Sequence, residues 1–334
     1  MNNAVKSTCI LTLSAMIWGF AFVAQRSGME HVGPFFFNGV RTVLGALTLI
    51  VFLLIQSGAR RGAGASKLPP SADPARARVA GKPAAFLNDE RKTLLQGGLL
   101  CGLVLFAGSN FQQIGLVFTT ASKAGFITAL YIILVPIFGI FLRHKTHWNT
   151  WTGVLLAAAG LYCLCVTESL SIDPGDLVIL FGAAFWAVHI LVIDHFVRRT
   201  SAIRLSCMQF LVCGAFSLAV MPFADAHFMT SPALRLESVL AALPAILYTG
   251  VLSSGAGFTL QAVGQRYANP TAASIIMSTE AIFGVIGGFL LLGERFTGRE
   301  LLGCVLMFAA VILAQLPLGG REAARAERSA QGSR

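Results

Sequence analysis

The stretch "TAASIIMSTEAIFGVIGGFLLLGER", residues 271–295, decides the fold class. It is almost entirely apolar and long enough to cross a bilayer, since a membrane-spanning helix needs about 20 apolar residues. Yet Glu280 stands near its middle, where burying a charge costs roughly 2.5 to 3.5 kcal/mol on insertion scales. A span that keeps such a residue predicts a partner or a ligand for the carboxylate, and therefore a polar chamber inside a helical bundle.

The whole chain has the composition of an integral membrane protein. Its 334 residues are 55% hydrophobic and 12% charged, whereas soluble domains carry about 25% charged residues. Ten apolar stretches predict an all-α integral membrane protein with ten transmembrane helices. Their expected limits are 8–24, 34–55, 93–117, 122–142, 150–167, 177–197, 205–223, 238–264, 271–292 and 301–316.

The basic residues predict how the chain is oriented. A net charge of +10 would suggest nucleic acid as the partner of a soluble protein, but here the basic residues crowd between the spans, so no nucleic acid is expected. With both termini in the cytoplasm, 19 of the 25 lysine and arginine residues lie on the inner side and five on the outer side. The positive-inside rule therefore predicts a multi-pass protein of the plasma (inner) membrane with both termini cytoplasmic.

Internal similarity predicts a duplicated architecture. "AMIWGFAFV" (15–23) resembles "AAFWAVHIL" (183–191) at an offset of 168 residues, and "QQIGLVF" (112–118) resembles "QAVGQRY" (261–267) at an offset of 149. We interpret these matches as two repeats of five spans each. An odd number of spans inverts the second repeat in the bilayer, and inverted repeats with a site at their interface are typical of transporters.

The repeats define the expected organisation of the chain. Residues 1–55 hold spans 1 and 2 of the first repeat, residues 93–167 its spans 3–5, and residues 168–316 the second repeat. Residues 56–92, rich in Pro, Ala, Gly and Arg, predict a disordered basic cytoplasmic linker, and residues 317–334 a cytoplasmic tail. Membrane lipid is an expected partner; the basic linker either touches anionic lipid or serves only to set the topology.

Two pairs of glycines have the spacing that lets helices approach closely. These are Gly98 with Gly102, and Gly284 with Gly288. Such pairs mark either a homodimer interface or packing within one monomer. The sequence leaves both readings open.

Several of these stretches together resemble a known family. The early "AMIWGFAFV", Arg41 after Pro34, "ASKAGFITALYIILVPIFG" (121–139) and "AASIIMSTEAIFGVIGGFLLLGERFTGRELLG" (272–303) resemble EamA-type transporters of the drug/metabolite transporter superfamily. The resemblance implies ten helices in an inverted five-plus-five repeat, with both termini cytoplasmic, and movement of small organic solutes such as amino acids, often outward. One departure is that the family commonly has Glu-Pro in span 9, whereas Ala281 follows Glu280 here. A gating kink at this point is therefore in doubt, since proline bends helices.

Few ionisable residues lie inside the spans, and each has two readings. Glu280 is either a substrate or proton ligand, or a structural acid satisfied by Ser278, Thr279 or Arg41. Arg41 is either an anchor for an anionic group or a structural counter-ion. At a rise of about 1.5 Å per residue the two lie at similar depths, so their long side chains could meet.

His189 and Asp194 lie further along span 6. His189 either relays protons or is simply hydrogen-bonded. Asp194 has Arg198 four residues later, which predicts a surface helix pair.

Polar and aromatic residues at repeat-related positions predict a binding cavity. Gln112 matches Gln261, Trp18 matches Trp186, and Tyr131 falls at the position equivalent to Glu280. Amides, a phenol and indoles around an apolar pocket would suit a zwitterionic or aromatic solute, or else make ordinary interhelical hydrogen bonds. The candidate substrate-binding residues are Glu280, Arg41, Trp18, Gln112, Tyr131, Trp186, His189 and Gln261.

These patterns favour a secondary transporter over a membrane-embedded enzyme. The sequence has no HExxH, GxSxG or P-loop motif, and its seven cysteines fall in spans with no zinc spacing, so no catalytic residue, metal or cofactor is expected. A channel or receptor-like protein is the third class, and the inversion counts against it, since it supplies two equivalent gates. We expect an exporter of a small organic metabolite that works by alternating access around a midplane cavity.

Overall fold

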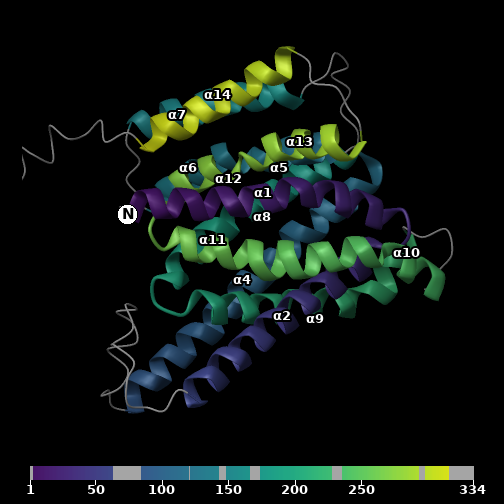
Figure 1. Ribbon diagram of the computed structural model, residues 1–334, viewed down its shortest axis with the longest axis vertical. Helices are drawn as coiled ribbons and strands as arrows, with labels where there is room; N and C mark the ends of the chain where they lie inside the picture. The colour runs from purple at the N-terminus through teal and green to yellow at the C-terminus, as the bar shows by residue number, and fades with distance from the viewer. Residues whose placement is uncertain are drawn as a thin grey trace, which may run out of the picture.

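A computed structural model describes residues 3–62, 84–119, 121–142, 148–165, 174–227, 235–292 and 298–315. Within these ranges the regular secondary structure is entirely helical (Figure 1). The α-helices are α1 (Asn3–Met29), α2 (Pro34–Gly62), α4 (Ala84–Phe118), α5 (Ala121–Ala129), α6 (Tyr131–Phe141), α7 (Trp148–Cys165), α8 (Pro174–Val197), α9 (Ala202–Ala224), α10 (Leu236–Leu247), α11 (Phe258–Gln265), α12 (Pro270–Met277), α13 (Glu280–Leu292) and α14 (Gly298–Gln315). Two other helical types complete the order: the 3-10 turn η1 (Asp225–His227) and the π-helix η2 (Tyr248–Gly257).

The helices have the length and surface of membrane spans. Seven stretches of the described residues are long and apolar enough to cross a membrane: Asn3–Met29, Pro34–Ser57, Glu90–Phe118, Pro174–Val197, Ala202–Ala224, Leu236–Gln265 and Pro270–Gly287. Three shorter apolar helices accompany them, at Ile127–Phe141, Trp151–Gly160 and Leu301–Leu313. Large apolar side chains also stand on the outside of the bundle, for example Leu54 at 63% and Phe223 at 79% exposure. Such an exterior suits lipid rather than water, and the predicted all-α, multi-pass membrane fold is confirmed.

The helices extend into the predicted linker from both sides. Residues 56–92 were expected to lack structure, but α2 continues to Gly62 and α4 begins at Ala84. The α4 extension, residues 84–92, is rich in Ala, Leu, Glu, Arg and Lys, which favour helix, and the α2 extension contains Ala and two Arg. The four prolines of the linker fall between the two extensions. The intervening residues 63–83 and the tail 317–334 lie outside the described residues.

Helices from the two halves of the chain pack against one another (Figure 1). The main pairs are α4 with α8, α7 with α14 and α2 with α9, while α1 lies beside α11 and α13. Gly98 and Gly102 face α9, because a Cβ at either position would come within 2.5 Å of the Cβ of Met208 or Val212. This glycine pair therefore serves packing within the monomer.

The helix that carries Glu280 is interrupted just before it. α12 ends at Met277 and α13 begins at Glu280, and the amide of Thr279 bonds to Ile276 O instead of a carbonyl four residues back. The hydroxyls of Ser278 and Thr279 donate to carbonyls three residues back, at 2.8 and 2.6 Å. Hydroxyl groups that bond to the backbone in this way compete with helical hydrogen bonds. The break expected of a Glu-Pro pair is thus present without the proline.

The π-helix η2 joins α10 to α11 beside α1. Its small residues leave carbonyl groups open to α1, so that Ser14 Oγ donates to Gly257 O at 2.8 Å and Trp18 Nε1 to Ser253 O at 3.3 Å. π-helical segments are frequent at functional sites. Here the segment fixes the indole of Trp18 at the centre of the bundle.

Candidate functional site

A cavity lies inside the helical bundle. Seven of the eight predicted site residues line it, brought together from α1, α2, α4, α6, α8, α11 and α13. The full lining is Trp18, Ala21, Phe22, Gln25, Arg41, Gln112, Thr128, Tyr131, Trp186, Ile190, Ser253, Phe258, Gln261, Met277 and Glu280. The predicted residue that does not line it is His189.

Glu280 is buried, at 3% exposure, and its partner is a phenol. Tyr131 Oη donates a hydrogen bond to Glu280 Oε1 at 3.1 Å. The hydroxyls of Ser278 and Thr279, which were expected as possible partners, instead bond to their own helix. Across the described residues, no ion pair joins Glu280 to Arg41.

Arg41 is held by uncharged groups. Its Nε donates to Asn38 Oδ1 at 2.9 Å and its Nη1 to Gln25 Oε1 at 3.1 Å. The guanidinium also lies 5.9 Å from the ring centroid of Phe37. In the part of the chain that the structure describes, no carboxylate lies within ion-pair distance of Arg41, so the reading of Arg41 as a structural counter-ion has no acid to support it.

The two repeat-related glutamines differ in their bonding. Gln112 Nε2 donates to Thr128 Oγ1 at 3.0 Å. Gln261 also lines the cavity, and its Oε1 is buried with no hydrogen-bond partner among the described residues. Met277 lies 149 residues after Thr128, which is the same separation as between Gln112 and Gln261. Its side chain has no hydroxyl group that could bond to Gln261. One amide is therefore satisfied by the protein and the other is free to meet a ligand.

Aromatic rings form one wall of the cavity. The ring centroids of Trp18 and Phe258 are 4.7 Å apart, and Trp186 stacks on Phe258 at 5.9 Å. Trp186 Nε1 is buried without a hydrogen-bond partner within the described ranges. This wall can receive a planar or branched apolar group and still offer one N–H donor.

His189 lies behind this wall. It is completely buried, its Nε2 is 3.0 Å from Gln209 Oε1, and its ring meets those of Trp186 and Phe258 edge to face. His189 therefore does not line the cavity, and its expected role in binding a substrate stays a prediction. Asp194, by contrast, forms the predicted pair with Arg198 at 2.8 Å.

The sequence analysis missed the residues that hold Arg41. Gln25 lies just past the expected end of span 1, although it falls on the same face as Trp18, two helical turns earlier. Asn38 stands three residues before Arg41, and its Nδ2 donates to Ser109 Oγ at 2.9 Å and to Ser217 Oγ at 3.2 Å. Polar residues with these spacings were the available signal, but their partners come from other helices.

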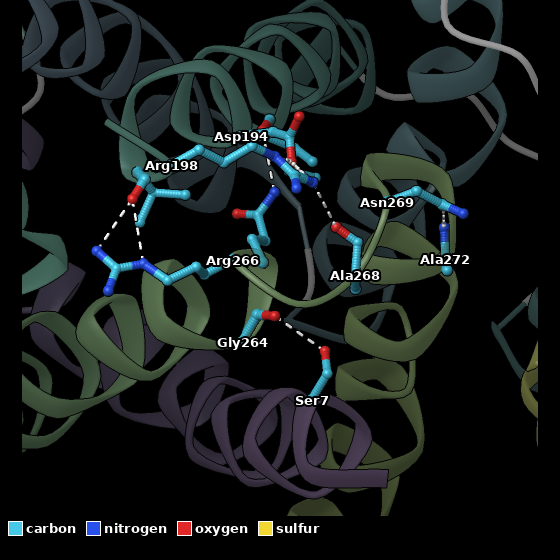
Figure 2. Close-up of polar contacts among 11 residues, drawn as sticks. Ser7, Asp194, Arg198, Gly264, Arg266, Ala268, Asn269 and Ala272 are labelled. Atoms are coloured by element: carbon cyan, nitrogen blue, oxygen red, sulfur yellow. Dashed lines mark hydrogen bonds and ion pairs between the residues drawn. The ribbon is translucent and has the colours of Figure 1, made fainter. Parts of the chain in front are cut away.

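Polar contacts join several helices at the end of the bundle where α1 begins (Figure 2). Arg266 donates to Val197 O and Thr200 O, which ties α11 to the end of α8. Ser7 Oγ donates to Gly264 O at 2.9 Å, and Arg198 Nη2 to Ala268 O at 3.1 Å. These bonds join α1, α8 and α11 on one side of the cavity.

Other contacts close the opposite end, where α2 begins. Arg26 Nη1 donates to Leu116 O at 2.7 Å, which joins α1 to α4. Asp225 accepts hydrogen bonds from the backbone N–H groups of Phe35 and Phe36, at 2.9 and 2.7 Å, and so caps α2 from the end of α9. Burial raises the pKa of the Asp225 carboxyl, while these two N–H groups act in the opposite direction. Hydrogen bonds thus join the helices at both ends of the bundle.

Comparison with known proteins places this helical membrane protein, whose cavity is lined by polar and aromatic residues, among the transporters. The family model of the EamA-like transporter family matches residues 6–166 and 173–316. The chain belongs to this family, as the sequence resemblance predicted, and it is a membrane transporter.

Relatives along nearly the full chain carry the same general description. An uncharacterized transporter of Archaeoglobus fulgidus is 28% identical over 92% of this chain and 84% of its own. The uncharacterized inner membrane transporter YedA of Escherichia coli K12 is 25% identical, over 90% of this chain and 88% of its own. A crystal structure with 16% identity superposes with a TM-score of 0.66, covering 92% of this chain and 96% of the other, which shows a shared fold.

Proposed function

We propose that the protein is a secondary transporter that exports a small organic metabolite across the plasma (inner) membrane. It works by alternating access around the central cavity, which lies between two inverted repeats of five spans, and both termini face the cytoplasm. The observation that carries the proposal is the hydrogen bond between Tyr131 and Glu280, two residues 149 positions apart in the chain. They occupy equivalent places in the two halves and meet in the cavity.

Equivalent helix breaks support the repeat. α5 gives way to α6 at Leu130, just before Tyr131, and α12 gives way to α13 at Ser278 and Thr279, just before Glu280. The same offset that aligns the sequences therefore aligns the two interruptions. Helices broken near the midplane are a recurring feature of transporter binding sites.

Reciprocal packing contacts support the repeat independently. Gly115 of α4 lies against the side chain of Ile179 of α8, and Gly264 of α11 lies against that of Leu11 of α1. Gly264 is 149 residues after Gly115, and Ile179 is 168 residues after Leu11, so the same contact occurs twice with the order of the helices exchanged. Such an exchange is what a pseudo-twofold relation between the halves requires.

The interhelical contacts at the two ends of the bundle supply the gates. Arg26 to Leu116 O joins spans 1 and 3 at one end, and Arg266 to Val197 O joins the equivalent spans 8 and 6 at the other. Releasing one set while keeping the other opens the cavity to one side of the membrane. Glu280 binds a proton or a cationic group during this cycle, and a solute or proton gradient drives it, because the sequence has no P-loop for ATP.

Transport in liposomes tests this function. Purified protein is first screened for thermal stabilisation by small organic solutes, and solutes that stabilise it are then used in counterflow assays. We expect saturable counterflow, and we expect Glu280→Gln to lower the flux or change its pH dependence. Glu237→Gln, at an exposed position in the first turn of α10, is the matched control. Absence of saturable flux would contradict the proposal, and normal flux in Glu280→Gln would make Glu280 a structural residue.

A further inference from the structure

Arg41 is a buried cation that faces the cavity without an acidic partner. It is 3% exposed and lines the cavity. Its two side-chain hydrogen bonds go to the neutral amides of Gln25 and Asn38, and within the described residues its Nη2 makes none. A charge buried in a membrane protein without a counter-ion is unfavourable, so residues of this kind pair with another group or bind a ligand.

The surrounding contacts orient the guanidinium rather than neutralise it. Asn38 is itself fixed by Ser109 and Ser217, so its oxygen is turned toward Arg41 Nε. The carboxylate of Glu280 also lines the cavity, but it accepts a hydrogen bond from Tyr131. The Nε and Nη1 atoms of Arg41 are thus fixed by neutral amides, while Nη2 has no partner among the described residues. This arrangement can receive a planar anion, because the guanidinium fork matches a carboxylate.

We propose that Arg41 binds the carboxylate of the transported solute, which is an organic acid with an aromatic or branched apolar body. This inference rests on the proposed transport function and specifies its substrate class. The carboxylate is the missing counter-ion of Arg41. The apolar body lies on the wall formed by Trp18, Phe258 and Trp186, and the free amide of Gln261 receives a polar group at the far end of the solute.

Binding of matched acids and amides to the detergent-purified full chain tests the carboxylate site. The probes are phenylacetate with phenylacetamide, and indole-3-acetate with indole-3-acetamide, which differ only in the charge of the head group. Since a charge-assisted hydrogen bond is worth more than a neutral one, we expect each acid to bind about tenfold or more tightly than its amide. In Arg41→Gln this preference disappears while the amides keep their affinity. Arg204→Gln is the control, because Arg204 is exposed on α9 and does not line the cavity.

A second variant keeps the test valid if Arg41→Gln fails to fold. Gln25→Glu places a carboxylate of the same size 3.1 Å from Arg41 Nη1, where Gln25 Oε1 now lies. The introduced group supplies Arg41 with a permanent counter-ion, so the variant should fold at least as well as the wild type. We expect it to lose the preference for the acids by the same factor as Arg41→Gln.

The outcomes separate this inference from the transport proposal. Equal affinity for acid and amide in the wild type, no measurable binding of either acid, or an acid preference that survives Gln25→Glu would each overturn the carboxylate site. Counterflow of the amides but not the acids would do so too, while leaving the transporter function intact. Failure of every solute to move in liposomes would contradict transport, and the binding assay would still decide the role of Arg41.

Discussion

The two halves of the chain share their packing contacts but not their chemistry. In the first half Gly39 of α2 faces Leu218 of α9, and in the second half Gly214 of α9 faces Val43 of α2, so that one shift of 175 residues exchanges the partners. The same shift takes Arg41 to Phe216, which is 45% exposed on the outer surface. Small residues therefore make matching contacts in the two halves, whereas the polar residues of the cavity differ between them.

α1 and α13 approach each other closely at Gly19, and the corresponding contact in the other half is different. A Cβ on Gly19 would lie 2.5 Å from the carbonyl oxygen of Glu280 and from the Cβ of Phe283. The equivalent residue of α8, 168 positions later, is Ala187, which keeps its methyl group buried in the cluster that includes Tyr131. The two halves thus differ by one methyl group at this crossing.

The largest effect is expected from Gly19→Ala. The new methyl group meets backbone that cannot rotate away, so the helices must separate, and we expect a loss of about 1 to 3 kcal/mol in the free energy of unfolding. This loss outweighs the gain of about 1 kcal/mol that Ala brings to a helix. Unfolding in mixed detergent micelles measures it. Gly298→Ala, where an added Cβ meets nothing within 4 Å, is the control, and an equal response of both variants would contradict the tight crossing.

The helix caps at Asp225 and Asn269 can be compared, because they stabilise helices at the two ends of the bundle. Asp225 caps α2 from another helix through two hydrogen bonds, whereas Asn269 caps its own helix α12 through one, to the amide of Ala272 at 2.7 Å. We expect Asp225→Ala to cost about 1 to 2 kcal/mol of stability and Asn269→Ala about 1 kcal/mol or less. Thermal unfolding in detergent ranks the two variants. A larger effect at Asn269 would show that the link between α2 and α9 contributes little.

The Asp225 cap also predicts a pH dependence. Because its folded-state pKa is raised above the ordinary value of 3.8, the folded protein holds this proton more tightly than the unfolded chain. Its contribution to stability therefore falls as the pH rises from 3.8 through the raised pKa. Asp225→Asn should flatten the stability profile over this window, and an unchanged profile would contradict the assignment.

Replacing Gln112 and replacing Gln261 should change the stability of the protein in different directions. Gln112→Leu breaks a buried hydrogen bond and leaves Thr128 without its donor, so we expect a loss of about 1 kcal/mol in stability. Gln261→Leu replaces an amide whose oxygen already has no partner in the described structure, and we expect it to be neutral or slightly stabilising while weakening solute binding. Equal destabilisation by both variants would mean that Gln261 has a partner within the protein.

Much of the fold and of the cavity could be predicted from the sequence. Each expected span corresponds to a helix or a broken helix pair, because about 20 apolar residues in a row have few other solutions in a membrane. The cavity residues were found because polar groups such as Gln112 and Gln261 recur at repeat-related positions. Their role in binding a solute remains a prediction.

The features that could not be predicted depend on how the helices rotate and pack, which the sequence pattern does not specify. His189 follows Trp186 by three residues and precedes Ile190 by one, yet only its neighbours line the cavity. One residue turns a helix by about 100°, so a small rotation of α8 decides which side chain faces inward. Similarly, Asn38 became significant only when Ser109 and Ser217 were found beside it on other helices.

The smallest loss of stability is expected from Asp194→Asn, in a contact that differs between the two ends of the bundle. Arg26 donates directly to Leu116 O, while Asp194, its equivalent 168 residues later, holds Arg198, and Arg198 in turn donates to Ala268 O. Arg198 is 48% exposed, so the ion pair is largely screened by water. Asp194→Asn should therefore lower the free energy of unfolding by only about 0.3 to 0.5 kcal/mol, and the loss should shrink further at high salt.

Arg198→Gln, which also removes the bond to Ala268 O, should lower it by more. A loss from Asp194→Asn as large as that from Arg198→Gln would show that the closure depends on the ion pair itself rather than on the arginine that reaches the neighbouring loop.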